Sequence, residues 1–120
     1  MTSRAPTDSL AQMAAQPWTD RENDLVVAAY FAMLAEDLAG RPYNKAARNR
    51  QLQDLLPERN RSSIEFKHQN MSAVLKGLGE AWIWGYKPAF NFQMSLVDAV
   101  ARWLATNPAW LSPPRRERMG

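Results

Sequence analysis

TDRENDLVVAAYFAML, residues 19–34, is the stretch that decides the fold. Thr19 and Glu22 have the spacing of a capping box, in which each side chain accepts a hydrogen bond from the other residue's backbone N–H. The run from Leu25 to Leu34 is apolar on nearly every side of a helix. We therefore expect a helix that begins at Thr19 and lies at the centre of the fold.

A second helix is predicted over residues 45–56. Gly40 and Pro42 end the first helix, because glycine favours the C′ position and proline cannot continue a helix. Asn44 then provides an N-cap, and Pro57 follows the last apolar position. The polar turn from Pro57 to Arg61 separates this helix from the next.

A third helix is predicted over about 62–78, because Ser62-Ser63-Ile64-Glu65 is a second possible capping box. Gly79 is its expected C-cap. At about 100° per residue, one face is apolar and faces the core; it contains Ile64, His68, Met71, Leu75 and Leu78. The opposite face is expected to point outward, and it contains Glu65, Phe66, Gln69, Asn70, Ala73 and Lys76.

Residues 80–93 are rich in aromatic side chains and contain Gly85 and Pro88, so we expect an ordered loop that crosses the core. A fourth helix is expected over 94–106. The predicted fold is therefore an all-α compact bundle of about four helices, with a flexible leader at 1–16, a helical domain at 17–111 and a basic disordered tail at 112–120.

Composition excludes several classes of function. Cysteine is absent and His68 is the only histidine, which argues against a metal site, a cofactor or a catalytic triad. We expect a non-enzymatic protein in which His68 is a partly buried, hydrogen-bonding residue. The sequence has no apolar run of membrane-spanning length and no signal-peptide pattern. A cytoplasmic location without membrane contact is predicted, associated with the nucleoid if the domain binds DNA.

Charge is unevenly distributed along the chain. Residues 19–40 contain five acidic side chains and one basic one, whereas residues 41–76 contain eight basic and three acidic ones. This pattern predicts a polarised surface with one face suited to a polyanion. The alternative interpretation is that helical surfaces are simply charged.

Two motifs resemble a known family. The opening Trp18-Thr19-Asp20-Arg21-Glu22-Asn23-Asp24-Leu25 resembles that of Myb/SANT repeats, and Arg61-Ser62-Ser63-Ile64-Glu65-Phe66-Lys67 resembles the start of their recognition helix. With Tyr43-Asn44-Lys45 and Gly85-Tyr86-Lys87-Pro88, residues 18–106 are similar to a module at the N-terminus of bacterial proteins that can carry nuclease domains of restriction or defence systems. In this module, Met71 and Leu75 would fill the volume of the late tryptophan of Myb repeats.

The resemblance implies double-stranded DNA binding through a helix-turn-helix, with residues 62–78 as the recognition helix in the major groove. Its chemistry assigns phosphate contacts to basic and hydroxyl side chains, adenine contacts to amides, and either guanine edges or the DNA backbone to Lys67 and Lys76. The candidate residues are Lys45, Arg48, Arg59, Arg61, Ser62, Ser63, Lys67, Gln69, Asn70, Lys76 and Lys87.

A protein-interaction module is the alternative function. Helical folds of this kind bind either DNA or proteins, so the fold alone does not decide between them. Phe66 points outward on the predicted helix and either packs under the aromatic loop or contacts a protein. A homodimer or a partner protein would then bind through Phe66 and the loop from Trp82 to Phe92.

Overall fold

The computed structural model describes residues 16–110. Over this range the chain forms four α-helices, one 3-10 helix and no strand, so the all-helical prediction is confirmed. The predicted leader (apart from residue 16) and the predicted basic tail lie outside the described residues. The elements are α2 (Asp20–Leu38), α3 (Lys45–Leu55), α4 (Arg61–Gly77), α5 (Met94–Thr106) and η2 (Pro108–Trp110).

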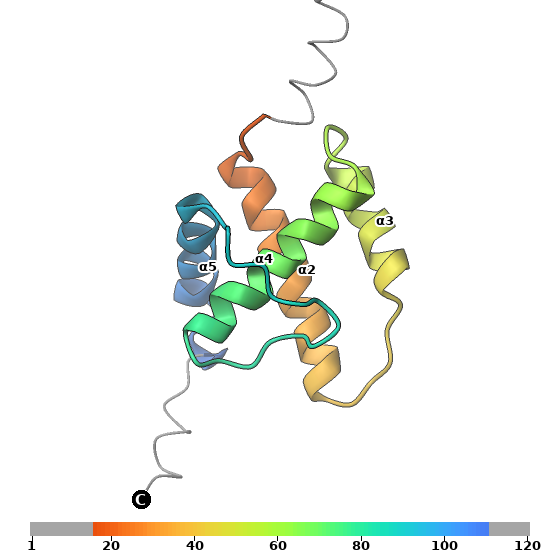
Figure 1. Ribbon diagram of the computed structural model, residues 1–120. Helices are drawn as coiled ribbons and strands as arrows, with labels where there is room; N and C mark the ends of the chain where they lie inside the picture. The colour runs from red at the N-terminus through yellow and green to blue at the C-terminus, as the bar shows by residue number, and fades with distance from the viewer. Residues whose placement is uncertain (1–15, 111–120) are drawn as a thin grey trace, which may run out of the picture.

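Helix α2 is central, as its apolar sequence predicted. It packs against α3, α4 and α5, and Figure 1 shows α4 crossing α2 with α3 and α5 on either side. Val26, Val27, Tyr30 and Met33 of α2 are fully buried. The core is completed by apolar side chains of the other elements, including Leu52, Ile64, Met71, Leu75, Ile83, Leu96 and Val100.

Most of the predicted helix ends are confirmed. The Glu22 amide donates to the Thr19 hydroxyl at 3.1 Å, and the Thr19 amide donates to the Glu22 carboxylate at 3.0 Å. Asn44 caps α3 by accepting from the Ala47 amide at 2.8 Å. Gly40 has φ of +72°, the left-handed conformation that glycine adopts at little cost after a helix.

The predicted N-cap of α4, Ser62, is wrong. Its N-cap is Asn60, whose side chain accepts from the Ser63 amide at 2.8 Å, while the Ser63 hydroxyl accepts from the Asn60 amide at 3.1 Å. Asparagine is as good an N-cap as serine, and Ser63 provides the reciprocal bond that was expected from Glu65. The helix therefore begins at Arg61, and the turn between α3 and α4 comprises residues 56–60, one residue earlier than predicted.

The aromatic loop, residues 79–93, crosses α4 as an ordered strap (Figure 1). Tyr30, Ser72 and Ile83 form a closed ring of hydrogen bonds that joins α2, α4 and the loop. The Ile83 amide donates to the Tyr30 hydroxyl at 2.8 Å, and the Ser72 hydroxyl donates to the Ile83 carbonyl at 3.3 Å. The Tyr30 hydroxyl therefore donates to Ser72 across the remaining 2.8 Å contact.

Replacing Tyr30 with phenylalanine is expected to lower the free energy of unfolding by about 1–3 kcal/mol, because it leaves the buried Ile83 amide without an acceptor. Urea denaturation followed by circular dichroism measures this loss. The matched control is Tyr43→Phe, since the Tyr43 side chain is only half-buried and we expect a change below about 0.5 kcal/mol. Equal effects of the two substitutions would contradict a structural role for the hydrogen-bonded ring.

His68 lies deeper than the sequence predicted. Its side chain is fully buried, 4.8 Å from the Tyr86 ring and 6.0 Å from the Tyr30 ring between centroids. Among the described residues neither ring nitrogen has a hydrogen-bond partner, so the prediction of a partly buried, hydrogen-bonding residue is wrong. Burial, and to a smaller extent the charge of Lys45, lowers the pKa of His68 to about 4. The imidazole is therefore neutral at physiological pH.

Candidate nucleic-acid interface

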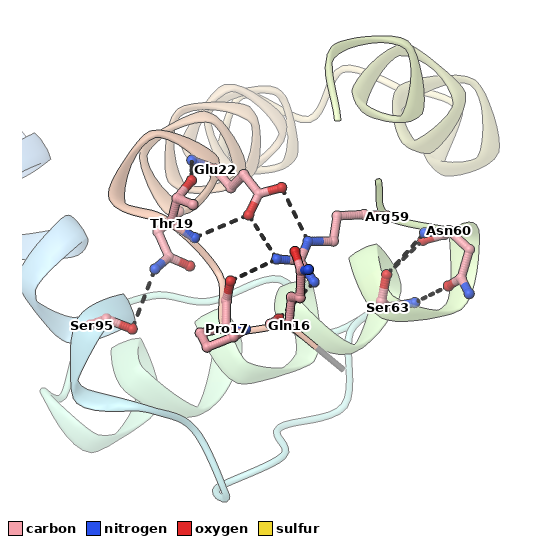
Figure 2. A network of polar contacts seen from close by, with 9 residues as sticks. Gln16, Pro17, Thr19, Glu22, Arg59, Asn60, Ser63 and Ser95 are labelled. Carbon is pink, nitrogen blue, oxygen red and sulfur yellow. Dashed lines mark hydrogen bonds and ion pairs between the residues drawn. The ribbon is translucent and has the colours of Figure 1, made fainter. Parts of the chain in front are cut away.

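Arg59 occupies the centre of a buried polar network (Figure 2). Its guanidinium forms a bidentate ion pair with the Glu22 carboxylate, at 2.8 and 3.1 Å. It also donates to the backbone carbonyls of Gln16 and Pro17, both at 2.9 Å. Its central carbon lies 4.6 Å from the Trp18 ring centroid. These bonds use four of the five guanidinium N–H donors.

The prediction that Arg59 contacts phosphate is therefore wrong. Only 2% of its side chain is exposed, and its donors are committed to Glu22 and to the segment that precedes α2. The hydrogen bonds from Arg59 lower the pKa of Glu22 more than burial raises it. Arg59 is thus a structural residue that holds Gln16 and Pro17, which precede α2, against the start of α4.

Contrary to the prediction, Lys67 and Asn70 also do not lie on an exposed face that could read the DNA groove. Both side chains are buried. The Lys67 ammonium lies 5.1 Å from the Trp18 ring centroid, and burial lowers the pKa of Lys67, with a further contribution from the charge of Arg59. The Asn70 amide donates to the Ala89 carbonyl of the loop at 2.7 Å. Neither side chain is presented to a DNA base edge.

The loop explains why the predicted outward face of α4 is only partly correct. It covers the middle of the helix, so Asn70 and Ala73 are buried where exposure was expected. Leu78, expected to face the core, is 57% exposed because it lies beyond the last turn that the core covers. The N-terminal half of α4 remains open, with Arg61, Ser62, Glu65 and Phe66 exposed and Gln69 half-buried.

A groove of about 270 Å³ separates α3 from the open half of α4. Lys45 and Arg61 line it from the two helices, and Tyr86 of the loop contributes its third side. The Lys45 ammonium donates to the Gly85 carbonyl at 2.9 Å and lies 4.7 Å from the Tyr86 ring centroid. The groove therefore brings together residues from three elements. Its full lining is Lys45, Ala46, Asn49, Arg61, Glu65 and Tyr86.

Lys87 lies at the edge of the same region. The loop is fixed at Gly85, by Lys45, and at Ala89, whose amide donates to the Gln69 carbonyl at 3.0 Å. Lys87 is exposed midway between these two attachment points. It therefore lies between the contact of the loop with α3 and its contact with α4. We call this surface the α3–α4 face; it comprises Lys45, Arg61, Ser62, Gln69 and Lys87.

Three other predicted residues do not join this face. Arg48 is half-buried in a hollow between α2 and α3, beside Leu25 and Leu52. The Ser63 side chain is engaged in the cap of α4. Lys76 lies near the opposite end of α4, with its ammonium 5.4 Å from the Trp82 ring centroid.

Sequence reasoning missed Asn49 in the groove, whereas it had placed Tyr86 beside Lys87 in the loop as a further possible contact. Asn49 is four residues after Lys45, a spacing that places both on one face of a helix. Helical periodicity could therefore have identified Asn49. The Asn49 amide donates to the Arg61 carbonyl at 3.2 Å and joins the two helices at the groove. Tyr86 comes from the loop, and no periodicity of the sequence indicates its place.

Two further findings concern the described residues as a whole. Between residues 16 and 110 there is no group of three or more histidine, cysteine or acidic side chains placed to hold a metal ion. No helix within that same range has both the length and the apolar character needed to cross a membrane. Comparison of the chain with protein-family models, with curated proteins and with solved structures finds no match.

Proposed function

We propose that this domain binds double-stranded DNA through the α3–α4 face. The observation that carries the proposal is the convergence of three exposed basic side chains, Lys45, Arg61 and Lys87, from three different elements. They surround the open N-terminal half of α4. Cations arranged in this way around the exposed half of a helix fit the phosphates on both sides of a major groove.

Each residue of the face has a role in this proposal. Arg61 and Lys87 bind phosphates on either side of α4, and Lys45 does so from α3. The Ser62 hydroxyl lies in the first turn of α4, where backbone amides and the helix dipole favour a phosphate. Gln69, about two turns further on, has an amide able to pair with adenine N6 and N7 in the major groove.

The arrangement of α2, α3 and α4 is consistent with the Myb/SANT-like helix-turn-helix to which the sequence has a resemblance. In this proposal α4 is the recognition helix, and α3 and α4 pack across the short turn of residues 56–60. The domain would act as a DNA-targeting module in a bacterial regulatory or defence system. The set of contacts is smaller than the sequence predicted, since Arg59, Lys67 and Asn70 serve the fold and Arg48, Ser63 and Lys76 do not join the face.

Fluorescence anisotropy with a labelled random-sequence duplex, at about 50 to 200 mM salt, tests this proposal. The double variant Arg61→Ala/Lys87→Ala is expected to bind at least about tenfold more weakly and to reduce the salt slope of log K by about 2. The matched control is Arg41→Ala/Arg102→Ala, which removes the same charge from side chains that form ion pairs with Glu36 and Asp24. Equal losses in the two variants would show that net charge, and not the α3–α4 face, determines binding.

Protein binding is the second candidate function. Three aromatic side chains support it, since Phe66, Trp84 and Phe90 are 39%, 82% and 55% exposed. Aromatic residues are enriched in protein interfaces, and a homodimer or a partner protein could cover Phe66 and the loop. Absence of duplex binding at about 50 mM salt would shift the assignment to this function.

A further inference from the structure

Trp84 is held outside the core by an anchored turn. The Tyr86 amide donates to the Ile83 carbonyl at 3.0 Å, which closes a tight turn with Trp84 and Gly85 at its tip. Ile83 and Tyr86, at the two ends of the turn, are both buried, whereas Trp84 is 82% exposed. The turn therefore presents a large aromatic ring to solvent from fixed supports, although the ring contributes almost nothing to the core.

The Trp84 ring continues an aromatic stack. It lies 5.9 Å from the Trp82 ring between centroids, at an interplanar angle of 24°. Trp82 is itself half-buried and packs against the core, so the stack begins on a supported ring and ends on an exposed one. A third planar group can therefore add to the stack on Trp84 without any rearrangement of the domain.

Cations lie beside this stack. The Lys76 ammonium is 5.4 Å from the Trp82 ring centroid, and the Lys45 ammonium is held at the Gly85 carbonyl, next to Trp84. Lys87 is exposed three residues further along the loop. Lysine is depleted in protein interfaces, whereas aromatic rings combined with cations are typical of single-stranded nucleic-acid binding.

We propose that Trp84, supported by Trp82, is a stacking platform for an unpaired nucleobase of DNA. A base in duplex DNA has no free face, so the ligand is a single-stranded segment or a base extruded from the helix. This inference rests on the proposed function, because Lys45 connects the turn to the α3–α4 face. The domain then holds a duplex on α4 and stacks an unpaired base beside it.

The test compares the full chain's binding to a labelled twelve-residue thymidine oligonucleotide with its binding to an abasic oligonucleotide of the same length and charge. We expect the thymidine oligonucleotide to bind about 5- to 100-fold more tightly, since stacking on one aromatic ring contributes a factor of this order per base. Trp84→Ala is expected to abolish this preference, and Trp84→Phe to retain most of it. Because Trp84 is exposed, the urea midpoints of both variants should equal that of the wild type.

Phe90→Ala is the matched control, since Phe90 is another exposed aromatic residue of the loop. Its preference for thymidine should equal that of the wild type. Three results would each overturn the inference. The first is an unchanged preference in Trp84→Ala, and the second is an equal loss in Trp84→Ala and Phe90→Ala. The third is a wild type that binds both oligonucleotides equally. Duplex binding reports separately on the proposed function, and Trp84→Ala should retain duplex binding. If the wild type showed a Trp84-dependent preference for thymidine but bound no duplex, only the duplex proposal would be refuted.

Discussion

Replacing Arg59 with alanine is expected to lower the free energy of unfolding by about 3–5 kcal/mol, which places it among the most destabilising substitutions in the chain. The reason is the environment of its partner, because the Glu22 side chain is only 12% exposed. Without Arg59 this largely buried carboxylate loses its bidentate partner and keeps only the Thr19 amide as a hydrogen-bond donor and the more distant charge of Lys67. The carbonyls of Gln16 and Pro17 also lose their donors, and Trp18 loses one of the two cations beside its ring. Urea denaturation at pH 7 measures the effect.

Arg102→Ala is the matched control for this substitution. Arg102 also forms an arginine–carboxylate pair, at 2.7 Å from Asp24, but its side chain is 44% exposed. Exposed pairs contribute less than about 1 kcal/mol, because water and salt screen them. If Arg59→Ala were as mild as Arg102→Ala and instead weakened DNA binding, the structural role assigned to Arg59 would be wrong.

Acidification is expected to destabilise the domain through His68. The pKa of this residue falls from 6.5 to about 4 on folding, because burial disfavours the imidazolium. The unfolded chain therefore takes up a proton before the folded chain does. The contribution of His68 to the free energy of unfolding therefore has its full value above pH 6.5. It decreases as the pH falls from 6.5 to 4, and it does not change further below pH 4. The total loss is about 3 kcal/mol.

His68→Leu isolates this contribution from that of Glu22, whose lowered pKa also makes stability fall in acid. Leucine has a similar volume and removes two buried nitrogens that lack partners among the described residues. We expect this variant to be about 1–2 kcal/mol more stable than the wild type at pH 7. The difference between the two proteins should widen toward pH 4 in urea titrations. A constant difference across this pH range would contradict the buried, neutral imidazole.

The helices could be predicted from the sequence because their signals are local. The Thr19–Glu22 capping box, the Asn44 cap and Gly40 each depend on residues within one turn, and all three appear in the structure as expected. The N-cap of α4 was predicted two residues too late, because Asn60 and Ser62 are both good caps. The choice between them depended on Ser63, whose hydroxyl completes the box with Asn60.

The candidate site was less predictable, because burial of its residues depends on contacts far apart in the chain. Arg59 pairs with a carboxylate 37 residues away, and Asn70 bonds to a carbonyl 19 residues away. A helical wheel places Asn70 on the outer face, but it carries no information about the loop that covers it. Arg61 and Ser62 were identified correctly as exposed residues, because the start of α4 has no covering segment among the described residues.

An NMR titration of the ¹⁵N-labelled chain with duplex DNA tests the central claim, binding through the α3–α4 face, most directly. We predict that the largest amide shift changes occur at Arg61, Ser62, Gln69 and Lys87, with little change along α5. Changes concentrated instead around Leu38 and Leu78, beside the apolar hollow at the ends of α2 and α4, would contradict the claim. So would a spectrum that duplex DNA leaves unchanged.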